Sequence, residues 1–236
     1  MVNEARMMDG APRRSSAHQP GISRHLGGVA LRPQRASPGS PVPCRPRSPA
    51  IGLPPRHQGQ HGAMLPAASA RIRLLLLDVD GVLTDGGLRY GDAGEERKVF
   101  HAQDGHALRV AQQHGLAVGL VSGRCLPAVA ARARELHLDP VLLGVADKLA
   151  RVESLLTQRG EDWATTAFMG DDLPDLPCLL RSGCSLAPAD ASPLVRQRVD
   201  HITRARGGRG AVAEAIGALL AAAGRAPEVA DATLHG

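Results

Sequence analysis

Acidic side chains gather after two apolar runs of this sequence. Asp78 and Asp80 follow one run, and Asp171 and Asp172 follow another. Carboxylates this close together beside apolar residues repel one another and lose hydration unless a cation or a shared proton compensates them. Oxygen ligands of this kind suit a hard divalent metal. The pattern therefore predicts a metal site, whereas a plain polar turn, in which an aspartate caps backbone amides, is the interpretation that better suits Asp85.

Groups that suit phosphate stand after two further apolar runs. Ser122-Gly123-Arg124 supplies a hydroxyl, a glycine amide and a guanidinium, although Ser-Gly is also an ordinary turn. Lys148 follows Asp147 at the predicted start of a helix. Only Lys98 and Lys148 are lysines, and the other 26 of the 28 basic residues are arginines. We interpret Lys148 as a site that needs a compact ammonium, with chance placement on a solvated helix as the alternative.

The elements that position these groups follow from the apolar pattern. The run from Ile72 to Leu77 is uninterrupted, which is typical of a strand buried on both faces of a parallel sheet. After a short hairpin over Tyr90 to Phe100, a helix capped by Asp104 and stopped by Gly115 is expected, and strands then alternate with helices. This alternation predicts an α/β fold with a doubly wound parallel sheet, whose ligands bind at the carboxyl ends of the strands. The later strands are expected at 116–121, 141–143, 165–169, 185–186 and 201–203, and the later helices at 126–136, 148–158, near 176 and at 211–223.

The chain divides by composition into three parts. Residues 1–70 are rich in Pro, Arg and Gly, and we expect this N-terminal extension to be disordered because it offers little to bury. A transit peptide is one alternative, and an over-extended gene model with Met64 as the true start is the interpretation that we favour. One α/β domain is expected at 71–224 and a flexible tail at 225–236.

Charge and cysteine content narrow the partners. The formal net charge is +5, but residues 1–63 hold nine arginines against two acids, so the predicted domain has no basic surface for nucleic acid. The four cysteines form no Cys-x-x-Cys pair, which favours reduced thiols over a zinc site. No apolar stretch reaches the roughly 18 residues of a membrane span. A soluble, cytoplasmic protein without a nucleic-acid or membrane partner is expected.

Taken together and in order, these motifs resemble the haloacid dehalogenase (HAD) superfamily. Its four motifs are Asp-x-Asp, a Ser or Thr, a Lys and a late acidic pair, and they span residues 72–203 here. Within the superfamily, the chain is similar to the family of 3-deoxy-D-manno-octulosonate 8-phosphate (KDO 8-phosphate) phosphatases. The similarity lies in Asp-Val-Asp-Gly-Val-Leu-Thr-Asp-Gly, Gly94-Glu95-Glu96 with Lys98 and Phe100, Asp104-Gly105, Ser-Gly-Arg, Gly-Asp-Asp-Leu-Pro-Asp-Leu-Pro and Gly-Gly-Arg-Gly-Ala-Val.

The resemblance implies an architecture as well as an activity. It implies a HAD-like Rossmannoid fold with a short β-hairpin flap and no cap domain, Mg²⁺ as the cofactor, and a homotetramer in which neighbouring subunits complete each sugar-phosphate pocket. It further implies that a Gly-rich segment reaches toward an active site, and Gly207, Gly208, Arg209 and Gly210 match that segment. A flexible linker into the last helix is the alternative for these four residues.

The resemblance also implies a role for each site residue. Asp78 is the nucleophile and binds magnesium together with Asp171 and the Asp80 backbone carbonyl, while Asp80 serves as the general acid and base. Ser122 and Lys148 hold the phosphoryl group, and Asp172 and Asp175 support the metal. The residues implied to contact the substrate are Asp80, His101, Ala102, Gln103, Asp104, Gly105, Arg109, Arg124, Arg132 and Lys148.

Two departures and several rival functions stay open at this point. Ser122 stands where the family usually has Thr, and Gln103 occupies a position that is often basic. The expected reaction is hydrolysis of KDO 8-phosphate through a phospho-aspartate, a step in lipopolysaccharide precursor synthesis. The alternatives are a phosphatase for another sugar phosphate, such as a nine-carbon keto-acid phosphate, a dehalogenase, a receiver-like phospho-acceptor and a non-catalytic, oligomerising HAD-like domain.

Overall fold

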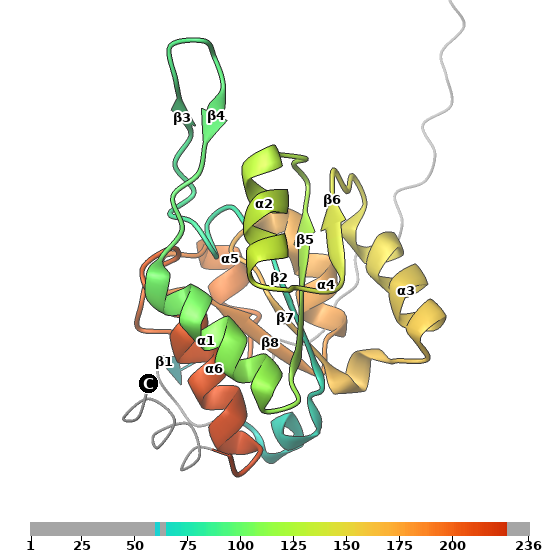
Figure 1. Ribbon diagram of the computed structural model, residues 1–236. Helices are drawn as coiled ribbons and strands as arrows, with labels where there is room; N and C mark the ends of the chain where they lie inside the picture. Colours follow the sequence, from blue (N-terminus) through green and yellow to red (C-terminus); the bar gives the residue numbers. More distant parts are fainter. Residues whose placement is uncertain (1–59, 62–64, 226–236) are drawn as a thin grey trace, which may run out of the picture. The chain divides into compact units, whose positions relative to one another are not determined.

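The computed structural model describes residues 60–61 and 65–225, which all fall within one compact unit that begins at Ile51. Its centre is a seven-stranded parallel sheet in the order β1-β9-β8-β7-β2-β5-β6 (Figure 1). The sequence order of the strands reverses on either side of β2, as in a doubly wound α/β fold. The strands are β1 (Gln60–His61), β2 (Leu74–Leu77), β5 (Ala117–Ser122), β6 (Val141–Leu143), β7 (Thr166–Met169), β8 (Cys184–Ala187) and β9 (His201–Ile202).

The strand β2 shows why this sequence forms a sheet with two covered faces. Its four leucines are all buried, and they alternate between two hydrophobic cores. Leu75 and Leu77 belong to one core, and Leu74 and Leu76 belong to the other. Because successive side chains of a strand point to opposite faces, an unbroken apolar run needs a layer of helices on each side.

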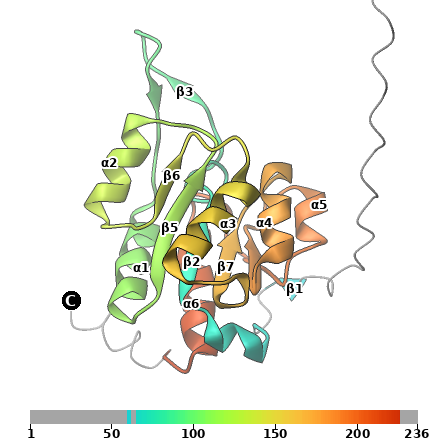
Figure 2. The same cartoon turned by 90° about the vertical axis from the view of Figure 1, so that its right-hand side faces the viewer.

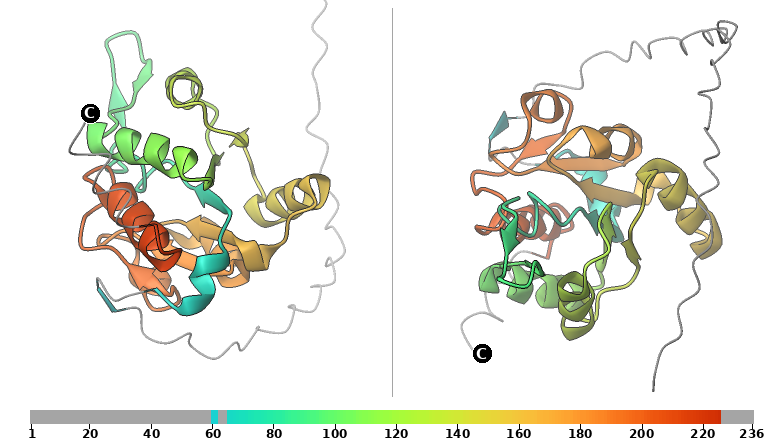
Figure 3. Two further views of the ribbon diagram at one scale, coloured as in Figure 1. Left: turned by 60° about the horizontal axis from the view of Figure 1, so that its bottom comes forward. Right: turned by 90° about the horizontal axis from the view of Figure 1, so that it is seen from above.

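Helices supply those two layers (Figure 2). The core that contains Leu75 also contains residues of α1, α2 and α6, and the core that contains Leu74 contains residues of α3, α4 and α5. Figure 3 shows the same three-layer arrangement from above and from below. The helices are α1 (Ala102–Gln113), α2 (Pro127–Glu135), α3 (Lys148–Arg159), α4 (Leu176–Arg181), α5 (Pro193–Arg196) and α6 (Ala211–Ala222), with short 3-10 helices at Ala67–Arg71, Trp163–Thr165 and Leu173–Asp175.

A hairpin of β3 (Arg89–Tyr90) and β4 (Glu96–Arg97) rises from the body of the domain (Figure 1). Between Asp80 and Ser122 the chain forms only this hairpin, α1 and β5. Between Lys148 and Asp171 it forms α3, a 3-10 helix and β7. Neither connection carries an inserted domain, so the carboxyl ends of the strands are left uncovered by large insertions.

Several predictions differ from the structure in detail. Regular structure begins before Arg71, because β1 pairs with β9 and a 3-10 helix covers Ala67–Arg71. Residues 1–59 and 62–64 of the predicted extension, and the predicted tail apart from Arg225, lie outside the described residues. The short helix α5 was not expected. Over the described residues, no helix combines the length and apolarity needed to cross a membrane.

The predicted cap of α1 is wrong. His101 occupies the N-cap position, and Asp104 lies within the first turn of the helix. The carboxylate of Asp104 instead accepts hydrogen bonds from the backbone N–H groups of Gly210 and Ala213, at 3.2 and 2.8 Å, and so caps α6. The periodicity of α1 could not indicate this contact, because the partner residues lie 106 and 109 positions away in the sequence.

Candidate active site

The strand register brings the predicted site residues to one edge of the sheet. Leu77 at the end of β2 is paired with Leu120 of β5 on one side and Met169 of β7 on the other. Asp78 therefore emerges between the ends of two neighbouring strands, and its backbone N–H donates to the carbonyl of Met169 at 3.0 Å. This is the edge at which open α/β sheets bind their ligands.

Asp78 meets Lys148 in the interior of this edge. The Nζ atom of Lys148 lies 2.9 Å from Oδ1 of Asp78 and 2.6 Å from Oδ1 of Asp175, and all three residues are buried. Burial and the neighbouring Asp175 raise the pKa of Asp78 to about 6, against the opposing pull of Lys148. Burial alone would lower the pKa of Lys148, but the two carboxylates outweigh it and raise that pKa. The single positive charge of Lys148 thus faces two carboxylates and cannot neutralise both.

Asp171 adds a third carboxylate and makes the excess of negative charge larger. Oxygens of Asp78, Asp171 and Asp175 lie within 4.8 Å of one another, and burial, followed by Asp175 and Asp78, raises the pKa of Asp171 to about 7. A Cβ on Gly81 would lie 2.1 Å from Oδ2 of Asp171, so only glycine lets this carboxylate approach the loop. Such a set fits a divalent metal, because a cation would relieve both the repulsion and the lost hydration.

Asp175 supports the other two acids. Its Oδ2 atom accepts hydrogen bonds from the backbone N–H groups of Asp171 and Asp172, at 3.1 and 3.3 Å, while Oδ1 contacts Lys148. With its oxygens engaged in this way, Asp175 holds the loop and the lysine in place, which leaves Asp78 and Asp171 as the carboxylates available to a metal.

Asp80 is held by a different group of residues. Its Oδ1 atom accepts a hydrogen bond from Nζ of Lys98, a side chain that is only 1% exposed. Lys98 also contacts Oε1 of Glu96 at 2.8 Å, and the other oxygen of Glu96 accepts a 2.6 Å hydrogen bond from Arg124. The Nε atom of Arg124 lies 3.8 Å from Oδ2 of Asp80, so these four side chains form a closed ring of alternating charge.

The sequence alone does not indicate this ring. Lys98 and Glu96 stand out there only as part of the family motif, which gives neither residue a role. The signal that could have found Lys98 is its rarity, because it is one of two lysines in a chain of 26 arginines. Both lysines prove to contact an aspartate of the Asp-x-Asp motif, Lys148 at Asp78 and Lys98 at Asp80.

A cavity of about 280 Å³ opens between these groups. Ser122 is buried at its base, and the Ser122 hydroxyl accepts a hydrogen bond from the backbone N–H of Arg124 at 3.1 Å. The cavity brings together eight of the predicted site residues, and its lining consists of Asp78, Asp80, Gly86, Ser122, Gly123, Arg124, Lys148, Asp171, Asp172, Pro174 and Asp175. Its surface is thus mixed in charge, with carboxylates, one ammonium and one guanidinium around a hydroxyl.

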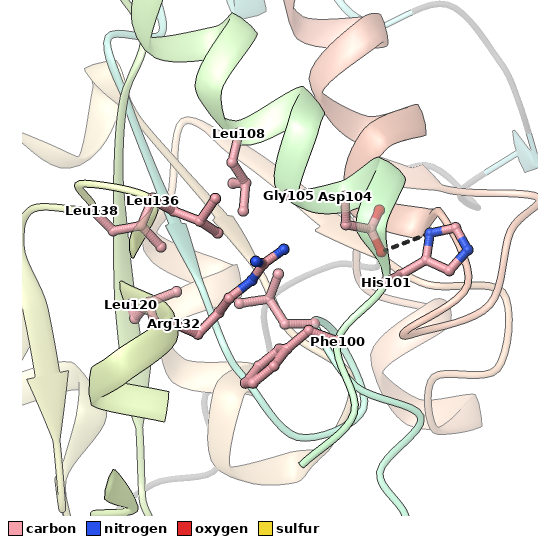
Figure 4. Close-up of a pocket in the computed structure, with 10 residues that line it drawn as sticks. Phe100, His101, Asp104, Gly105, Leu108, Leu120, Arg132, Leu136 and Leu138 are labelled. Carbon is pink, nitrogen blue, oxygen red and sulfur yellow. Dashed lines mark ion pairs between the residues drawn. The ribbon is translucent and has the colours of Figure 1, made fainter. Parts of the chain in front are cut away.

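Four of the residues predicted to contact the substrate line a separate small cavity (Figure 4). The guanidinium of Arg132 lies 5.9 Å from the ring centroid of Phe100 and points across Gly105, where a Cβ would lie 2.1 Å from Nη2 of Arg132. His101 and Asp104 stand on the other side, with Nδ1 of His101 3.9 Å from Oδ2 of Asp104. Within one chain these residues do not line the cavity around Asp78.

The remaining predicted residues lie elsewhere on the domain. Ala102 and Gln103 line a groove between α1 and α6, and Arg109 is exposed on α1. The backbone N–H of Gly208 donates to the carbonyl of Val82 at 2.9 Å, and a Cβ on Gly207 would lie 1.8 Å from the carbonyl oxygen of Gly81. In the described structure, the Gly-rich segment thus packs on this chain's own loop after Asp80.

The neighbouring positions of that segment have separate contacts. Arg209 is exposed and lies 3.9 Å from Asp85, and Gly210 begins α6 in a left-handed conformation. Asp85 itself accepts a hydrogen bond from the backbone N–H of Gly87 at 3.1 Å. The interpretation of Asp85 as a polar turn residue is therefore confirmed.

Fold and site together define a class. A doubly wound parallel sheet that presents Asp-x-Asp, a serine, a lysine and a late acidic cluster at adjacent strand ends is the arrangement of a HAD-superfamily hydrolase. One solved structure with this fold is a putative HAD-superfamily hydrolase of subfamily III A from Legionella pneumophila, with a TM-score of 0.68 and 34% identity over 72% of this chain and 93% of that chain.

Comparison with known proteins narrows the class to a family. No family model matches the chain. A curated relative, the 3-deoxy-D-manno-octulosonate 8-phosphate phosphatase KdsC of Escherichia coli (strain B / BL21-DE3), is 40% identical over 170 residues, which cover 72% of this chain and 90% of the relative. The solved phosphatase of the same name from Moraxella catarrhalis, in complex with magnesium, phosphate and KDO, has a TM-score of 0.69 and 32% identity, over 70% of this chain and 95% of that chain. The chain belongs to the family of 3-deoxy-D-manno-octulosonate 8-phosphate phosphatases.

Proposed function

We propose that this protein hydrolyses KDO 8-phosphate to KDO and phosphate, with Mg²⁺ as its cofactor. The observation that carries the proposal is the cavity in which Asp78, Asp80, Ser122, Lys148 and Asp171 meet. The printed ligands of the Moraxella catarrhalis structure support the substrate and the metal. In a cell that makes lipopolysaccharide, the reaction would supply a sugar-acid precursor.

The chain's own residues divide the reaction into two steps. Asp78 attacks the phosphorus atom of the ester, and the bond to the leaving sugar oxygen breaks as a phospho-aspartate forms. Asp80 gives its proton to that oxygen, then takes a proton from the water that cleaves the phospho-aspartate. Lys148 and Ser122 offset the charge of the phosphoryl oxygens and orient them. The sugar alcohol thus leaves with the proton from Asp80, and Asp80 regains a proton from the attacking water as phosphate is released.

Asp78, Asp171 and the backbone carbonyl of Asp80 would hold the magnesium ion, with Asp172 and Asp175 in support. Bound there, the ion would offset the charge of the ester, so that an anionic carboxylate can approach it. The raised pKa values of Asp78 and Asp171 support this assignment, because burial first and neighbouring carboxylates second destabilise their charged forms, and a bound cation would offset both effects.

Phosphate release from a panel of sugar phosphates, with and without Mg²⁺, tests the proposal. The panel contains KDO 8-phosphate, a nine-carbon keto-acid phosphate and common hexose phosphates. A magnesium-dependent preference for KDO 8-phosphate is expected. Broad and weak activity would keep a phosphatase and overturn the named substrate, whereas no release from any ester would favour a non-catalytic domain.

A single chain does not form a complete pocket for the sugar end of the substrate. His101, Asp104, Gly105 and Arg132 stand around a separate cavity, and Arg109 is exposed. We propose that the enzyme has no cap domain and that neighbouring subunits of a homotetramer complete the pocket. The predicted reach of residues 207–210 toward an active site remains part of this proposal, alongside their contacts within the chain.

The hairpin supports such an assembly. Leu88, Tyr90 and Val99 are 49%, 63% and 54% exposed, and a two-stranded hairpin gains little stability alone. Light scattering after size exclusion measures the assembly, and a mass near four times 24.7 kDa is expected. A fully active monomer would overturn the role of neighbouring subunits. The cytoplasmic location expected from the cysteine content and the lack of a long apolar stretch is proposed with it, and fractionation of cells tests it.

A further inference from the structure

Lys98 occupies an unusual position, because it joins the hairpin to the proposed acid and base. It lies just after β4, whereas Asp80 lies just after β2. Its side chain is 1% exposed and donates to Oδ1 of Asp80. A lysine buried to this degree needs a negatively charged partner, since an unpaired buried ammonium is strongly destabilised. The ion pair therefore fixes both the hairpin base and the carboxylate.

The other members of the ring make the position of Lys98 definite. Glu96 is the second partner of Lys98, at 2.8 Å, and its side chain is 10% exposed. Arg124, which follows β5, holds the other oxygen of Glu96 at 2.6 Å. Asp80 thus has a cation facing each of its oxygens, one supplied by the hairpin and one by the end of β5.

We propose that Lys98 is a positioning residue that holds the carboxylate of Asp80 in the orientation needed for proton transfer, and that Glu96 and Arg124 hold Lys98 in turn. The inference rests on the proposed phosphatase function, in which Asp80 moves the protons. In the described ion pairs Lys98 contacts only Asp80 and Glu96, and none of the other four acids that line the cavity. Its effect on catalysis is accordingly expected to pass through Asp80.

The first test replaces Lys98 by glutamine in the full chain. Lys98→Gln should lower kcat on the sugar phosphate by about 10²-fold, the order expected when a general acid and base is misplaced, while KM changes by less than about threefold. Lys98→Arg should recover part of the loss, because it restores a cation. Arg97→Gln is the matched control on the same hairpin, since Arg97 pairs only with the exposed Glu95 among the described ion pairs, and its kcat should stay at the wild-type value.

A double-mutant cycle tells positioning from a general structural effect. In an Asp80→Asn background, Lys98→Gln should change the residual rate by less than about threefold, because the group through which it acts is gone. Equal losses in both backgrounds would overturn the proposal. Absence of phosphate release by the wild-type protein would instead overturn the proposed function, so the two failures are distinguishable.

The leaving group provides a second, independent readout. The p-nitrophenolate of p-nitrophenyl phosphate departs without a proton, so the first-turnover burst with this substrate does not need a well-placed acid. The burst rate of Lys98→Gln should therefore stay within about threefold of wild type while its kcat on the sugar phosphate falls. Equal loss on both substrates would contradict positioning of Asp80.

A variant that keeps Lys98 guards against a failure to fold. Glu96→Gln retains the contact between Lys98 and Asp80 and weakens the support for Lys98 and Arg124. We expect a loss of about tenfold in kcat, with the same dependence on the leaving group. Wild-type kcat in a folded Glu96→Gln protein, together with an unfolded or fully active Lys98→Gln protein, would overturn the proposal.

Discussion

The two aspartates of the Asp-x-Asp motif are held in contrasting ways. Asp78 is 8% exposed and shares Lys148 with Asp175, and all three residues are buried: Asp78 directly after β2, Lys148 at the start of α3 and Asp175 in a 3-10 helix. The Asp80 side chain is 26% exposed, and its lysine comes from the hairpin. Buried positions in a packed core are rigid, whereas hairpins open more readily. The nucleophile Asp78 is therefore held firmly, whereas the orientation of the proton-transfer group Asp80 depends on a hairpin.

The largest effect on activity is expected from the buried nucleophile, Asp78. Asp78→Asn should lower the rate of phosphate release by at least about 10⁴-fold, because the amide cannot form the phospho-aspartate. Its metal-free stability should equal or exceed that of wild type, since an ionisable group with a raised pKa is removed. Activity assays and thermal unfolding check both parts. Substantial turnover by this variant would remove Asp78 from the mechanism.

Loss of Lys148 should cost both rate and stability. Lys148→Gln leaves Asp78 and Asp175 without their shared cation in a buried site, so we expect a loss of about 3 kcal/mol in the free energy of unfolding. Arg151→Gln, at an exposed position of the same helix, is the control and should stay within about 0.5 kcal/mol of wild type. Urea unfolding measures both. Similar stabilities for the two variants would contradict the view that Asp78 is held by a buried ion pair with Lys148.

The stability of the metal-free protein should depend on pH through the same carboxylates. Asp78 and Asp171 have pKa values raised to about 6 and about 7, so the folded chain binds more protons than the unfolded chain. The free energy of unfolding should therefore fall as pH rises from about 4 through about 7. Mg²⁺ should raise the melting temperature more at pH 7.5 than at pH 5.5.

Thermal unfolding across pH, with and without Mg²⁺, measures this prediction. Asp171→Asn is the matched variant, because it removes the higher of the two raised pKa values. Its metal-free melting temperature should vary less with pH than that of wild type. An equal magnesium effect at both pH values would mean that these carboxylates are not the ones that the ion relieves.

The smallest expected effect concerns the support behind Asp80. Asp104→Ala removes the cap of α6 and should lower stability by about 1 kcal/mol. Asp104→Asn keeps one acceptor oxygen and should lose less. The start of α6 directly follows residues 207 and 208, which pack on the loop after Asp80. Loosening α6 should therefore disturb that loop, so a small decrease in kcat is expected, larger than any change in KM. Thermal unfolding and steady-state kinetics report the two effects.

Much of the rigid region could be predicted from the sequence. The run that forms β2 and the alternation of strands with helices indicate a parallel sheet, and the strand ends then bring Asp78, Ser122, Lys148 and Asp171 together. These predictions succeed because periodicity determines which residues are buried, and parallel strands end at one edge. The sequence motifs and the strand pattern thus independently predict the same location for the site.

The hairpin region could not be predicted in the same way. No periodicity fixes the direction in which a hairpin leaves the domain, so the contact between Lys98 and Asp80 had no signal beyond the rarity of lysine. The cap that Asp104 gives to α6 is likewise a contact between distant parts of the chain. The predicted extension before residue 60 and the segment after Arg225 lie outside the described residues.

The contact of Gly207 and Gly208 with the loop after Asp80 has a consequence for synthesis. Translation delivers Asp78 and Asp80 early, yet their loop receives the Gly208 N–H on the Val82 carbonyl only when nearly the whole domain has been made. A nascent chain that stops before Gly207 carries the nucleophile without this backing. The order in which the ribosome releases the segments therefore keeps the phosphatase centre unfinished until late in translation, and a premature stop codon before Gly207 removes a neighbour of residues that were synthesised much earlier.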